Sequence, residues 1–364
     1  MKVMTVLGTR PEIIRLSRII PLLDELCDHT LVFTGQNFDH NLSTLFFNEL
    51  GVRKPDFSLE TRADTTWAQI GNILAQTDVI LGEVKPDRFL ALGDTNSALT
   101  TQCAKRRGIT VYHMEAGNRC FDDRVPEEVN RRVIDHSSDI LLPYTNRSRD
   151  HLLREGFHPN RVYVTGNPIK EVMDYYAPQI DGSDVLKRLG VLPEEYFLVT
   201  LHRAENVDIP ERLHSFMNAF AAISQKYGLS VLLSLHPRTR ARLDAGTYRA
   251  GKGVRFIDPP GFFDFVHLEK HAKALLSDSG TVQEEGCIMK RPTVTLRDVT
   301  ERPETLECGS NILSGCGIEE IPRCLALVLS REGQWKVPVE YEEPQVSRIV
   351  GNLLMGYSAL RYLP

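Results

Sequence analysis

The chain has 364 residues, enough for about two domains of ordinary size. Hydrophobic residues make up 42% and charged residues 25%, so we expect a buried core that needs no disulfide or metal to fold. The net charge of -5 offers no broad basic field and argues against nucleic-acid and membrane partners. The longest apolar runs have the length of strands and are too short to span a membrane.

Cysteine usage points to a reducing compartment. The chain has 7 cysteines, an odd number, and no C-x-x-C motif, which argues against a disulfide framework and a zinc ribbon. Residues 1–8 read as a strand and lack the apolar stretch and cleavage site of a signal peptide. We therefore expect a cytoplasmic protein with reduced thiols.

The first half alternates short β-branched runs with amphipathic stretches. Strands are predicted at residues 2–7, 30–34, 88–92, 110–114 and 139–142. Helices are predicted at residues 11–26, 41–50, 66–83 and 97–107. This alternation predicts βαβ units around a parallel sheet.

The alternation of predicted strands and helices is interrupted at residues 166–168 and 179–184, where we place a linker. Strands are then predicted at residues 196–201, 230–235, 254–257, 274–277 and 293–296, and helices at 212–226, 282–289 and 319–330. The expected fold is α/β, with Rossmann-like domains at residues 1–170 and 183–340. Because ligands of such sheets bind beyond the carboxyl ends of the strands, we expect a cleft between the domains.

Two strand–helix junctions have residues suited to phosphate. Segment 8–12 (GTRPE) places Arg10 at a turn before a helix N-terminus, although an ordinary turn explains it equally well. Segment 277–281 (SDSGT) has the small residues that suit a diphosphate, and Glu285 follows one turn into the helix, where it would reach ribose hydroxyls. A structural N-cap is the commoner explanation of such a serine.

Three carboxylates follow predicted strands in the first half. Asp94 follows strand 88–92, Glu115 ends the next strand, and Glu127 lies at the start of the following helix. They would converge at one edge of the sheet, although each alone suits a cap or an ion pair. His113 and Glu115 are expected on the same side of their strand. Their H-x-E spacing lacks the P-C-x-x-C of zinc deaminases, so no metal is predicted.

Histidines follow two predicted strands of the second half. His202 precedes Arg203, a pair suited to a phosphate, and His236 follows the next strand. A histidine in this position is about equally often a structural residue. The sequence has no G-x-G-x-x-G or Walker A motif, so no nicotinamide cofactor is indicated. The expected ligand is a nucleotide diphosphate held without metal-binding motifs.

Taken together, these motifs resemble the non-hydrolysing UDP-N-acetylhexosamine 2-epimerases over nearly the whole chain. The resemblance is carried by segments 8–12, 34–37, 93–95, 114–117, 126–131, 202–206 and 277–285. It implies a glycosyltransferase-B-like fold, a homodimer, a UDP-sugar substrate and no cofactor. It also implies that a C-terminal helix within residues 345–364 crosses back to the first domain.

A narrower resemblance concerns the sugar. Segments 115–122, 261–264 and 36–39 resemble the capsule and O-antigen branch, which interconverts UDP-2-acetamido-2,6-dideoxy-L-talose and UDP-N-acetyl-L-fucosamine. The UDP-GlcNAc/UDP-ManNAc reaction is the alternative. Ala204 replaces one acid of the family's H-R-E-E-N. Segments 37–40 and 61–64 match poorly the residues that hold a second, allosteric nucleotide sugar, so activation by substrate is not expected.

The chemistry at C2 explains what such a site needs. That carbon is not α to a carbonyl, so its proton is barely acidic until UDP begins to leave C1. Elimination then gives UDP and a 2-acetamidoglycal, and re-addition with protonation on the opposite face gives the epimer. The resemblance assigns acid and base roles to Asp94, Glu115 and Glu127, with His202 supporting the leaving group. Which of the three carboxylates serves which face of C2 is left open.

The resemblance also implies binding residues. UDP contacts are expected from Arg10, Arg203, His236, Phe262, Ser279, Gly280, Thr281 and Glu285. Sugar contacts are expected from Asn118, Arg119, Arg131 and Arg302. A hydrolysing epimerase and a glycosyltransferase of the same fold are rival enzymes. A nucleotide-sugar-binding regulator is the rival outside enzymes, and the three carboxylates argue against it.

Overall fold

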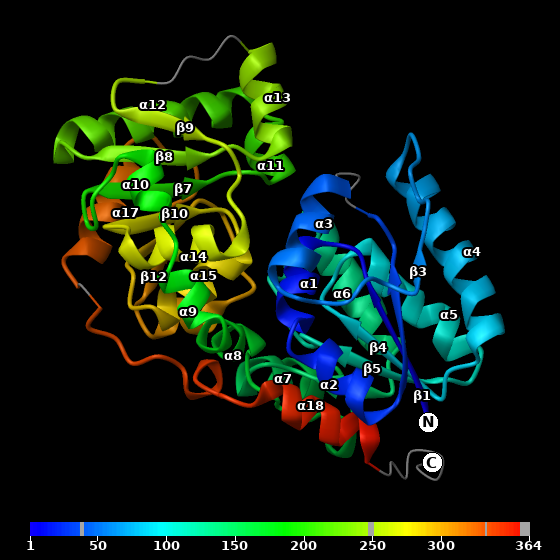
Figure 1. Ribbon diagram of the computed structural model, residues 1–364. Coiled ribbons are helices and arrows are strands. Elements are labelled where there is room, and N and C mark those ends of the chain that lie inside the picture. The colour runs from blue at the N-terminus through cyan, green and yellow to red at the C-terminus, as the bar shows by residue number, and fades with distance from the viewer. Residues whose placement is uncertain (37–39, 247–250, 332, 357–364) are drawn as a thin grey trace. The chain divides into compact units, whose positions relative to one another are not determined.

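The computed structural model describes residues 1–36, 40–246, 251–331 and 333–356, with the backbone alone described at 40–44 (Figure 1). The chain divides into two compact units. The first comprises Met1–Val172 with Val339–Pro364, and the second comprises Met173–Pro338. Each unit is built around a parallel sheet of six strands.

The sheet of the first unit has the strand order β3-β2-β1-β4-β5-β6. Its strands are β1 (Lys2–Leu7), β2 (Asp28–Phe33), β3 (Phe57–Ser58), β4 (Arg88–Leu92), β5 (Thr110–Met114) and β6 (Ile140–Leu142). Val6 of β1 lies opposite Val32 of β2 and Ala91 of β4. All three are buried, as expected for a parallel sheet covered on both faces.

The helices of the first unit lie between its strands, after its last strand β6 and, for η3 and α18, after the second unit. They are α1 (Arg10–Leu16), α2 (Ile19–Leu26), α3 (His40–Glu49), α4 (Thr66–Val84), η1 (Asn96–Thr100), α5 (Thr101–Arg106), α6 (Pro126–His136), α7 (Asn146–Arg154), η2 (Pro159–Arg161), α8 (Pro168–Tyr175), η3 (Val339–Tyr341) and α18 (Val346–Met355). The unit boundary falls within α8, after Val172.

The sheet of the second unit has the strand order β12-β11-β10-β7-β8-β9. Its strands are β7 (Tyr196–Thr200), β8 (Ser230–Ser234), β9 (Val254–Ile257), β10 (Ala274–Ser277), β11 (Thr293–Thr295) and β12 (Asn311–Leu313). Its helices are α9 (Ala177–Asp181), α10 (Val185–Leu189), α11 (Ala204–Val207), α12 (Pro210–Tyr227), α13 (Pro237–Ala245), α14 (Phe262–His271), α15 (Gly280–Ile288), α16 (Pro303–Glu307) and α17 (Glu320–Leu329).

Alternate residues of β7 show how this second sheet is covered. Phe197 and Val199 lie in a buried cluster with side chains of α12 and α17. Tyr196 and Leu198 lie in a second cluster with side chains of α10, α14 and α15. Helices therefore pack on both faces, and functional side chains are left to the strand ends. The α/β fold predicted from the sequence is confirmed, with a parallel sheet in each unit.

Proline explains why the helix predicted at 11–26 is two helices. In one continuous helix the N–H of residue 21 would bond to the carbonyl of Ser17, and Pro21 has no N–H. The chain instead ends α1 at Leu16 and begins α2 at Ile19, which puts Pro21 in a first turn where no N–H is needed.

The residues predicted as a linker, 166–168 and 179–184, lie at helix ends on either side of the unit boundary after Val172. Asn167 Oδ1 accepts the N–H of Ile169 at 3.0 Å and so caps α8. Gly182 is the C-terminal cap of α9. Proline just inside a helix start and glycine just past a helix end interrupt the sequence pattern without breaking the chain of helices.

The C-terminal helix α18 returns to the first unit. It packs against α2, as the red and blue helices of Figure 1 show. A Cβ on Gly351 would lie 3.0 Å from Leu22 Cδ2, so glycine permits this close approach. The N–H of Ser347 also donates to Glu171 Oε2 at 2.8 Å.

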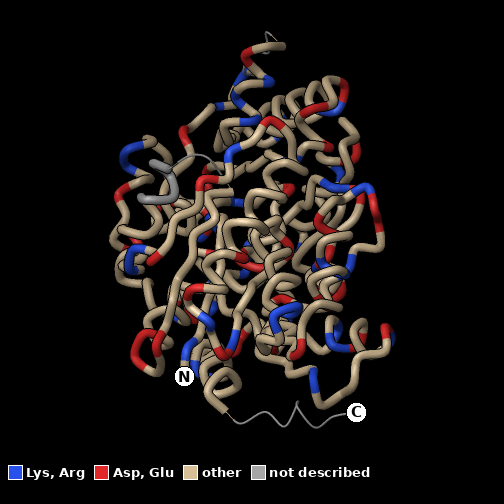
Figure 2. Tube along the Cα trace, turned by 90° about the vertical axis from the view of Figure 1, so that its right-hand side faces the viewer, with Lys and Arg blue, Asp and Glu red and all other residues tan. Residues whose placement is uncertain are grey.

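Charge is mixed over the molecule. Figure 2 shows Lys and Arg interspersed with Asp and Glu along the trace. Among the described residues, no helix is both long enough and apolar enough to cross a bilayer.

Candidate active site

The turn after β1 is held by a buried glutamate. Glu12 Oε2 accepts the N–H groups of Gly8 at 3.0 Å and Thr9 at 2.7 Å. Glu12 Oε1 accepts the hydroxyl of Thr95, in the turn after β4, at 3.0 Å. Burial raises the pKa of Glu12 to about 7, although hydrogen bonds from Thr9, Gly8 and Thr95 act in the opposite direction. Glu12 therefore ties two strand-end turns together.

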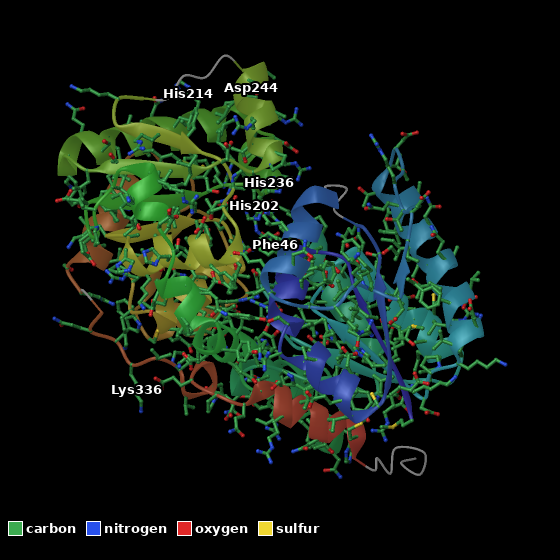
Figure 3. All side chains as sticks on the ribbon, in the orientation of Figure 1. Phe46, His202, His214, His236, Asp244 and Lys336 are labelled. Atoms are coloured by element: carbon green, nitrogen blue, oxygen red, sulfur yellow. The ribbon has the colours of Figure 1, made fainter. Side chains whose placement is uncertain are left out.

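Arg10 is the first residue of α1, one residue before the predicted helix start, and Pro11 lies in the first turn. The Arg10 guanidinium carbon lies 5.7 Å from the centre of the Phe46 ring of α3, which Figure 3 labels. An arginine at a helix N-terminus is suited to a phosphate, because free N–H groups and a positive charge lie together there.

Glu115 is paired with an arginine that the sequence analysis did not single out. Arg15 Nη1 of α1 forms a short hydrogen bond and ion pair with Glu115 Oε2, and the two side chains are only 3% and 7% exposed. Asn118 Nδ2 donates to Glu115 Oε1 at 3.2 Å. Arg15 could have been identified as a candidate from the helix pattern, because it falls on the same face of α1 as Glu12, and that face is buried.

The prediction that His113 and Glu115 share one side of a strand is wrong. β5 ends at Met114, and Glu115 has a φ of 65°, outside strand geometry. His113 contacts Asp135 Oδ1 at 2.8 Å and the Gly93 carbonyl at 2.8 Å. His113 is therefore a satisfied core residue that braces the turn before Asp94.

Asp94 is held by Arg131 of α6. Arg131 Nη2 lies 2.6 Å from Asp94 Oδ2, and Arg131 Nη1 lies 3.0 Å from Glu128 Oε2. Asn130 Nδ2 donates to the Asp94 carbonyl at 3.0 Å. Arg131, expected to contact sugar, thus orients a predicted catalytic carboxylate. Glu127, in the first turn of the same helix, is half-buried.

The burial of Arg119 argues against the sugar contact that was expected of it. Its side chain is fully buried, with Nη2 at 2.7 Å from Asp135 and at 2.7 Å from Glu155. Its Nη1 donates to the Asn118 carbonyl at 2.8 Å. Asn118 itself is buried and receives the Ser148 hydroxyl at 2.8 Å while donating to Glu115. Arg119 braces the loop, whereas Asn118 lies against a predicted catalytic carboxylate.

In the second unit, Asp278 organises the segment after β7. It is fully buried and accepts the N–H groups of His202 and Arg203, each at 2.9 Å. His202 Nδ1 lies 3.0 Å from Asp278 Oδ1. Burial acts to raise the pKa of Asp278, but the charge and hydrogen bonds of His202 and the Arg203 N–H outweigh it and hold the pKa well below its usual range.

His202 and His236 lie near each other at the ends of neighbouring strands, as Figure 3 shows. Their ring centres are 5.6 Å apart. His236 caps α13, because its Nδ1 accepts the N–H of Arg238 at 3.3 Å. Arg203 Nε donates to the Asp278 carbonyl at 3.0 Å. The predicted histidines and Arg203 are thus brought together on one unit.

The turn after β10 begins α15 with small residues. Ser279 is the N-cap, Gly280 begins the helix, and the Ser279 and Thr281 hydroxyls lie 2.9 Å apart. A Cβ on Gly280 would lie 3.1 Å from Glu301 Oε1 and 3.3 Å from Arg302 Cζ. Arg302, predicted to contact sugar, thus lies beside the turn predicted for the diphosphate.

Two further predicted UDP contacts, Glu285 and Phe262, are buried on neighbouring helices. Glu285 of α15 is 4% exposed and Phe262, which begins α14, is 3% exposed. Glu269 of α14 is fully buried near Glu285. Burial and the negative charge of Glu285 raise the pKa of Glu269 well above its usual range. Glu269 is not among the residues predicted from the sequence.

The remaining sequence features concern metal ligands and two positions of the family motifs. Among the described residues, no group of three or more His, Cys, Asp or Glu side chains is placed to hold a metal ion. Gln36 Oε1 accepts the N–H of Ser97 at 3.1 Å, whereas residues 37–39 of the same motif lie outside the described residues. Ala204, at the position of the family's acid, begins α11.

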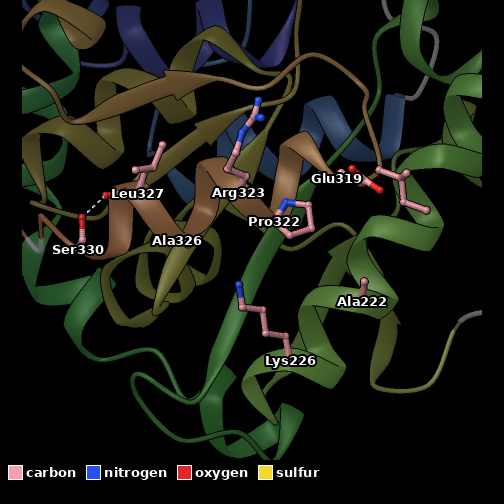
Figure 4. A pocket seen from close by; sticks show the side chains of 9 residues that line it. Ala222, Lys226, Glu319, Pro322, Arg323, Ala326, Leu327 and Ser330 are labelled. Carbon is pink, nitrogen blue, oxygen red and sulfur yellow. Dashed lines mark hydrogen bonds between the residues drawn. The ribbon is translucent and has the colours of Figure 1, made fainter.

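A groove elsewhere on the second unit contains none of the predicted residues. It encloses about 750 Å³ beside α12 and α17 (Figure 4). Lys226, Glu319 and Arg323 contribute its charged side chains, and Pro322 and Leu327 contribute apolar surface. It therefore plays no part in the candidate active site.

Comparison with known proteins decides the family. A family model described as UDP-N-acetylglucosamine 2-epimerase matches residues 23–354. The chain belongs to the UDP-N-acetylglucosamine 2-epimerase family. A UDP-N-acetylglucosamine 2-epimerase of Methanocaldococcus jannaschii is 39% identical over 347 residues, which cover 93% of this chain and 95% of the relative. Membership makes the chain an isomerase and confirms the family predicted from its motifs.

Two further relatives bear on fold and substrate range. The crystal structure of the M. jannaschii UDP-GlcNAc 2-epimerase, in complex with UDP-GlcNAc and UDP, has a TM-score of 0.92 at 38% identity and covers 98% of this chain and 100% of that chain. A UDP-2,3-diacetamido-2,3-dideoxy-D-glucuronate 2-epimerase of Pseudomonas aeruginosa is 35% identical over 344 residues, 92% of this chain and 95% of the relative. The glycosyltransferase-B-like fold is confirmed. The relatives are named for different sugar substrates.

Proposed function

We propose that the protein is a non-hydrolysing UDP-N-acetylhexosamine 2-epimerase. The observation that carries this proposal is the pairing of two strand-end carboxylates, Asp94 and Glu115, with buried arginines. Binding alone would not need anionic groups held in this way beside an anionic ligand. Proton transfer at C2 does need them, on both faces of the sugar ring.

The proposed reaction inverts C2 by elimination and re-addition. The C1–O bond to UDP breaks, and the electron pair of that bond leaves with the β-phosphate. A carboxylate removes the C2 proton, so a C1=C2 double bond forms and the product is a 2-acetamidoglycal. UDP oxygen then bonds to C1 again while a proton is delivered to the opposite face of C2. No hydride and no external cofactor takes part.

The first unit supplies the groups for proton transfer in this proposal. Asp94, Glu115 and Glu127 act as acid and base, with Arg131 and Arg15 holding the first two. Asn118 contacts the sugar or orients Glu115, because it lies between Ser148 and that carboxylate. Fixed partners keep a carboxylate in one geometry through the reaction and so lower the reorganisation that the transition state requires.

The diphosphate is assigned to cationic side chains and helix N-termini. Arg10 lies at the start of α1, and Ser279, Gly280 and Thr281 lie at the start of α15. His202, Arg203 and His236 supply further polar groups after β7 and β8. Such donors stabilise the negative charge that builds as UDP departs. Glu285 is assigned to ribose and Phe262 to uracil.

The sugar has two candidates. Segments 115–122 and 261–264 support UDP-2-acetamido-2,6-dideoxy-L-talose, converted to UDP-N-acetyl-L-fucosamine for capsule or O-antigen synthesis. The similarity to the M. jannaschii UDP-GlcNAc 2-epimerase, in sequence and in structure, supports UDP-GlcNAc, converted to UDP-ManNAc. The two substrates differ in ring configuration and at C6, where a methyl replaces a hydroxymethyl group. A homodimer is proposed on the family resemblance, and a cytoplasmic location is proposed on the cysteine usage.

Incubation with each UDP-sugar in D₂O tests reaction and substrate together. The proposal predicts deuterium at C2 of both epimers, read by NMR, with the UDP linkage intact in the product. Accumulation of free UDP and free sugar would instead indicate the hydrolysing reaction. Absence of C2 exchange with every UDP-2-acetamido sugar, by folded protein that binds UDP, would contradict the proposal.

A further inference from the structure

Asp278 is the residue around which the segment after β7 is arranged. It is fully buried at the end of β10, and β10 pairs directly with β7. Its carboxylate meets the His202 ring at 3.0 Å, the N–H of Arg203 at 2.9 Å and Asn206 Nδ2 at 3.2 Å. The N–H of His202 donates to it as well, at 2.9 Å. The structure therefore presents a carboxylate surrounded by donors.

This arrangement determines how the imidazole of His202 must be oriented. An ionised carboxylate can only accept hydrogen bonds, so the ring atom that faces it, Nδ1, must carry a proton. The side chain of His202 is 38% exposed, whereas Asp278 is fully buried. The ring thus has one nitrogen anchored in the interior and leaves Nε2 as the nitrogen that can meet a ligand.

We propose that Asp278 is a positioning residue that fixes the tautomer and direction of His202, so that Nε2 faces the departing diphosphate. The proposal rests on the proposed function, because it gives His202 its leaving-group role. With Nδ1 protonated, Nε2 is the nitrogen that takes up a second proton from solvent before the reaction, and as negative charge grows on the departing β-phosphate the resulting imidazolium donates its Nε2–H to it. The Asp278 carboxylate balances the positive charge of that imidazolium.

A purely structural role for Asp278 makes a different prediction. Asp278 also accepts the N–H of Arg203 and the amide of Asn206, so its loss could act through the segment alone. If Asp278 acts through His202, however, its replacement should matter only while the imidazole is present. A double-mutant cycle measures this difference, since residues that act as one unit give non-additive effects.

The tautomer is measured on the wild-type protein with ¹⁵N-labelled histidine, and the His202 signals are assigned by their loss in His202→Gln. The neutral ring is expected to carry its proton on Nδ1. A neutral ring protonated on Nε2 would overturn the proposal. Asn206→Ala is the matched control, because it removes another partner of Asp278 and spares the ring contact. It should keep the Nδ1 proton, and loss of that proton would show that segment packing sets the tautomer.

The kinetic arm compares Asp278→Asn in two backgrounds. With His202 present, kcat should fall about 10²-fold or more, with a much smaller change in KM. In the His202→Gln background, the same replacement should lower kcat by less than about threefold. An equal fall in both backgrounds would overturn the proposal. Lack of C2 exchange by the wild type would contradict the proposed function instead, and the tautomer measurement would still test Asp278.

Discussion

Arg15 and Glu115 form a buried ion pair between the first helix of the chain and the end of β5. They are 100 residues apart in sequence. The Arg15 guanidinium also lies 5.5 Å from the centre of the Tyr144 ring, after β6. The carboxylate at the strand end is therefore held from a different element, and the left-handed backbone of Glu115 is supported by the contacts of its own side chain.

Loss of this pair should destabilise the first unit. Arg15→Leu leaves Glu115 buried without its cation and should lower the free energy of unfolding by about 3 to 5 kcal/mol. Adding Glu115→Gln removes the orphaned charge, so the double variant should unfold at a higher urea concentration than Arg15→Leu alone. Equal midpoints for the two variants would show that the ion pair contributes little.

The three predicted acid–base residues should affect turnover far more than binding. Asp94→Asn, Glu115→Gln and Glu127→Gln each keep the approximate shape of the side chain and remove its acid–base function. Each should lower C2 exchange about 10²–10⁴-fold while UDP binding persists. Glu25→Gln, at an exposed position of α2, is the matched control and should exchange like the wild type. Near-normal turnover in all three variants would contradict the assignment.

Arg10 should contribute to nucleotide affinity. Arg10→Ala removes a cation from the N-terminus of α1 and should weaken UDP binding at least about tenfold, because a charge-assisted contact to phosphate is lost. Titration calorimetry measures the change, with Lys336→Ala, an exposed cation labelled in Figure 3, as control. Unchanged affinity in Arg10→Ala would exclude a phosphate contact for this residue.

Glu12 should make stability fall with rising pH. Its pKa is raised to about 7 by burial, so between its ordinary value and 7 the folded state holds a proton that the unfolded state releases. The stabilisation is complete at low pH and is lost as pH rises through about 7. Integrated over that window it amounts to about 3 kcal/mol.

Glu12→Gln cannot titrate and supplies the reference for that prediction. The thermal midpoint of the wild type, measured relative to Glu12→Gln, should fall as pH is raised from 5 to 8. A difference between the two proteins that stays constant over this range would show that Glu12 titrates at its ordinary pKa.

Much of the fold was predictable because its strands are buried on both faces and read as continuous apolar runs. β1, β4 and β5 begin and end where the sequence predicted. β3 and β12, strands of 2 and 3 residues at sheet edges, were not predicted, whereas β6, an edge strand of 3 residues made entirely of buried apolar side chains, was. The pairing of β3 and β12 depends on neighbouring strands and not on local pattern.

The types of residue in the candidate site could be predicted from the sequence, but the side chains that pair with them could not. Spacing placed Asp94 and Glu115 at strand ends, but it could not show that Arg131 and Arg15 hold them. Arg119 shows the same limit. The family resemblance implied a sugar contact for it, whereas in the structure its buried guanidinium is paired with Asp135. Side-chain direction after a strand depends on the long-range packing of neighbouring elements, which short motifs do not encode.

The central claim is that the bond between C1 and the UDP oxygen breaks and re-forms in each turnover. A UDP-sugar with ¹⁸O in the bridge between C1 and the β-phosphate tests this directly, by ³¹P NMR of the recovered substrate and its epimer. If the bond breaks, the label is expected to spread into the non-bridging positions of the β-phosphate. Retention of all label in the bridge while C2 is inverted would contradict it.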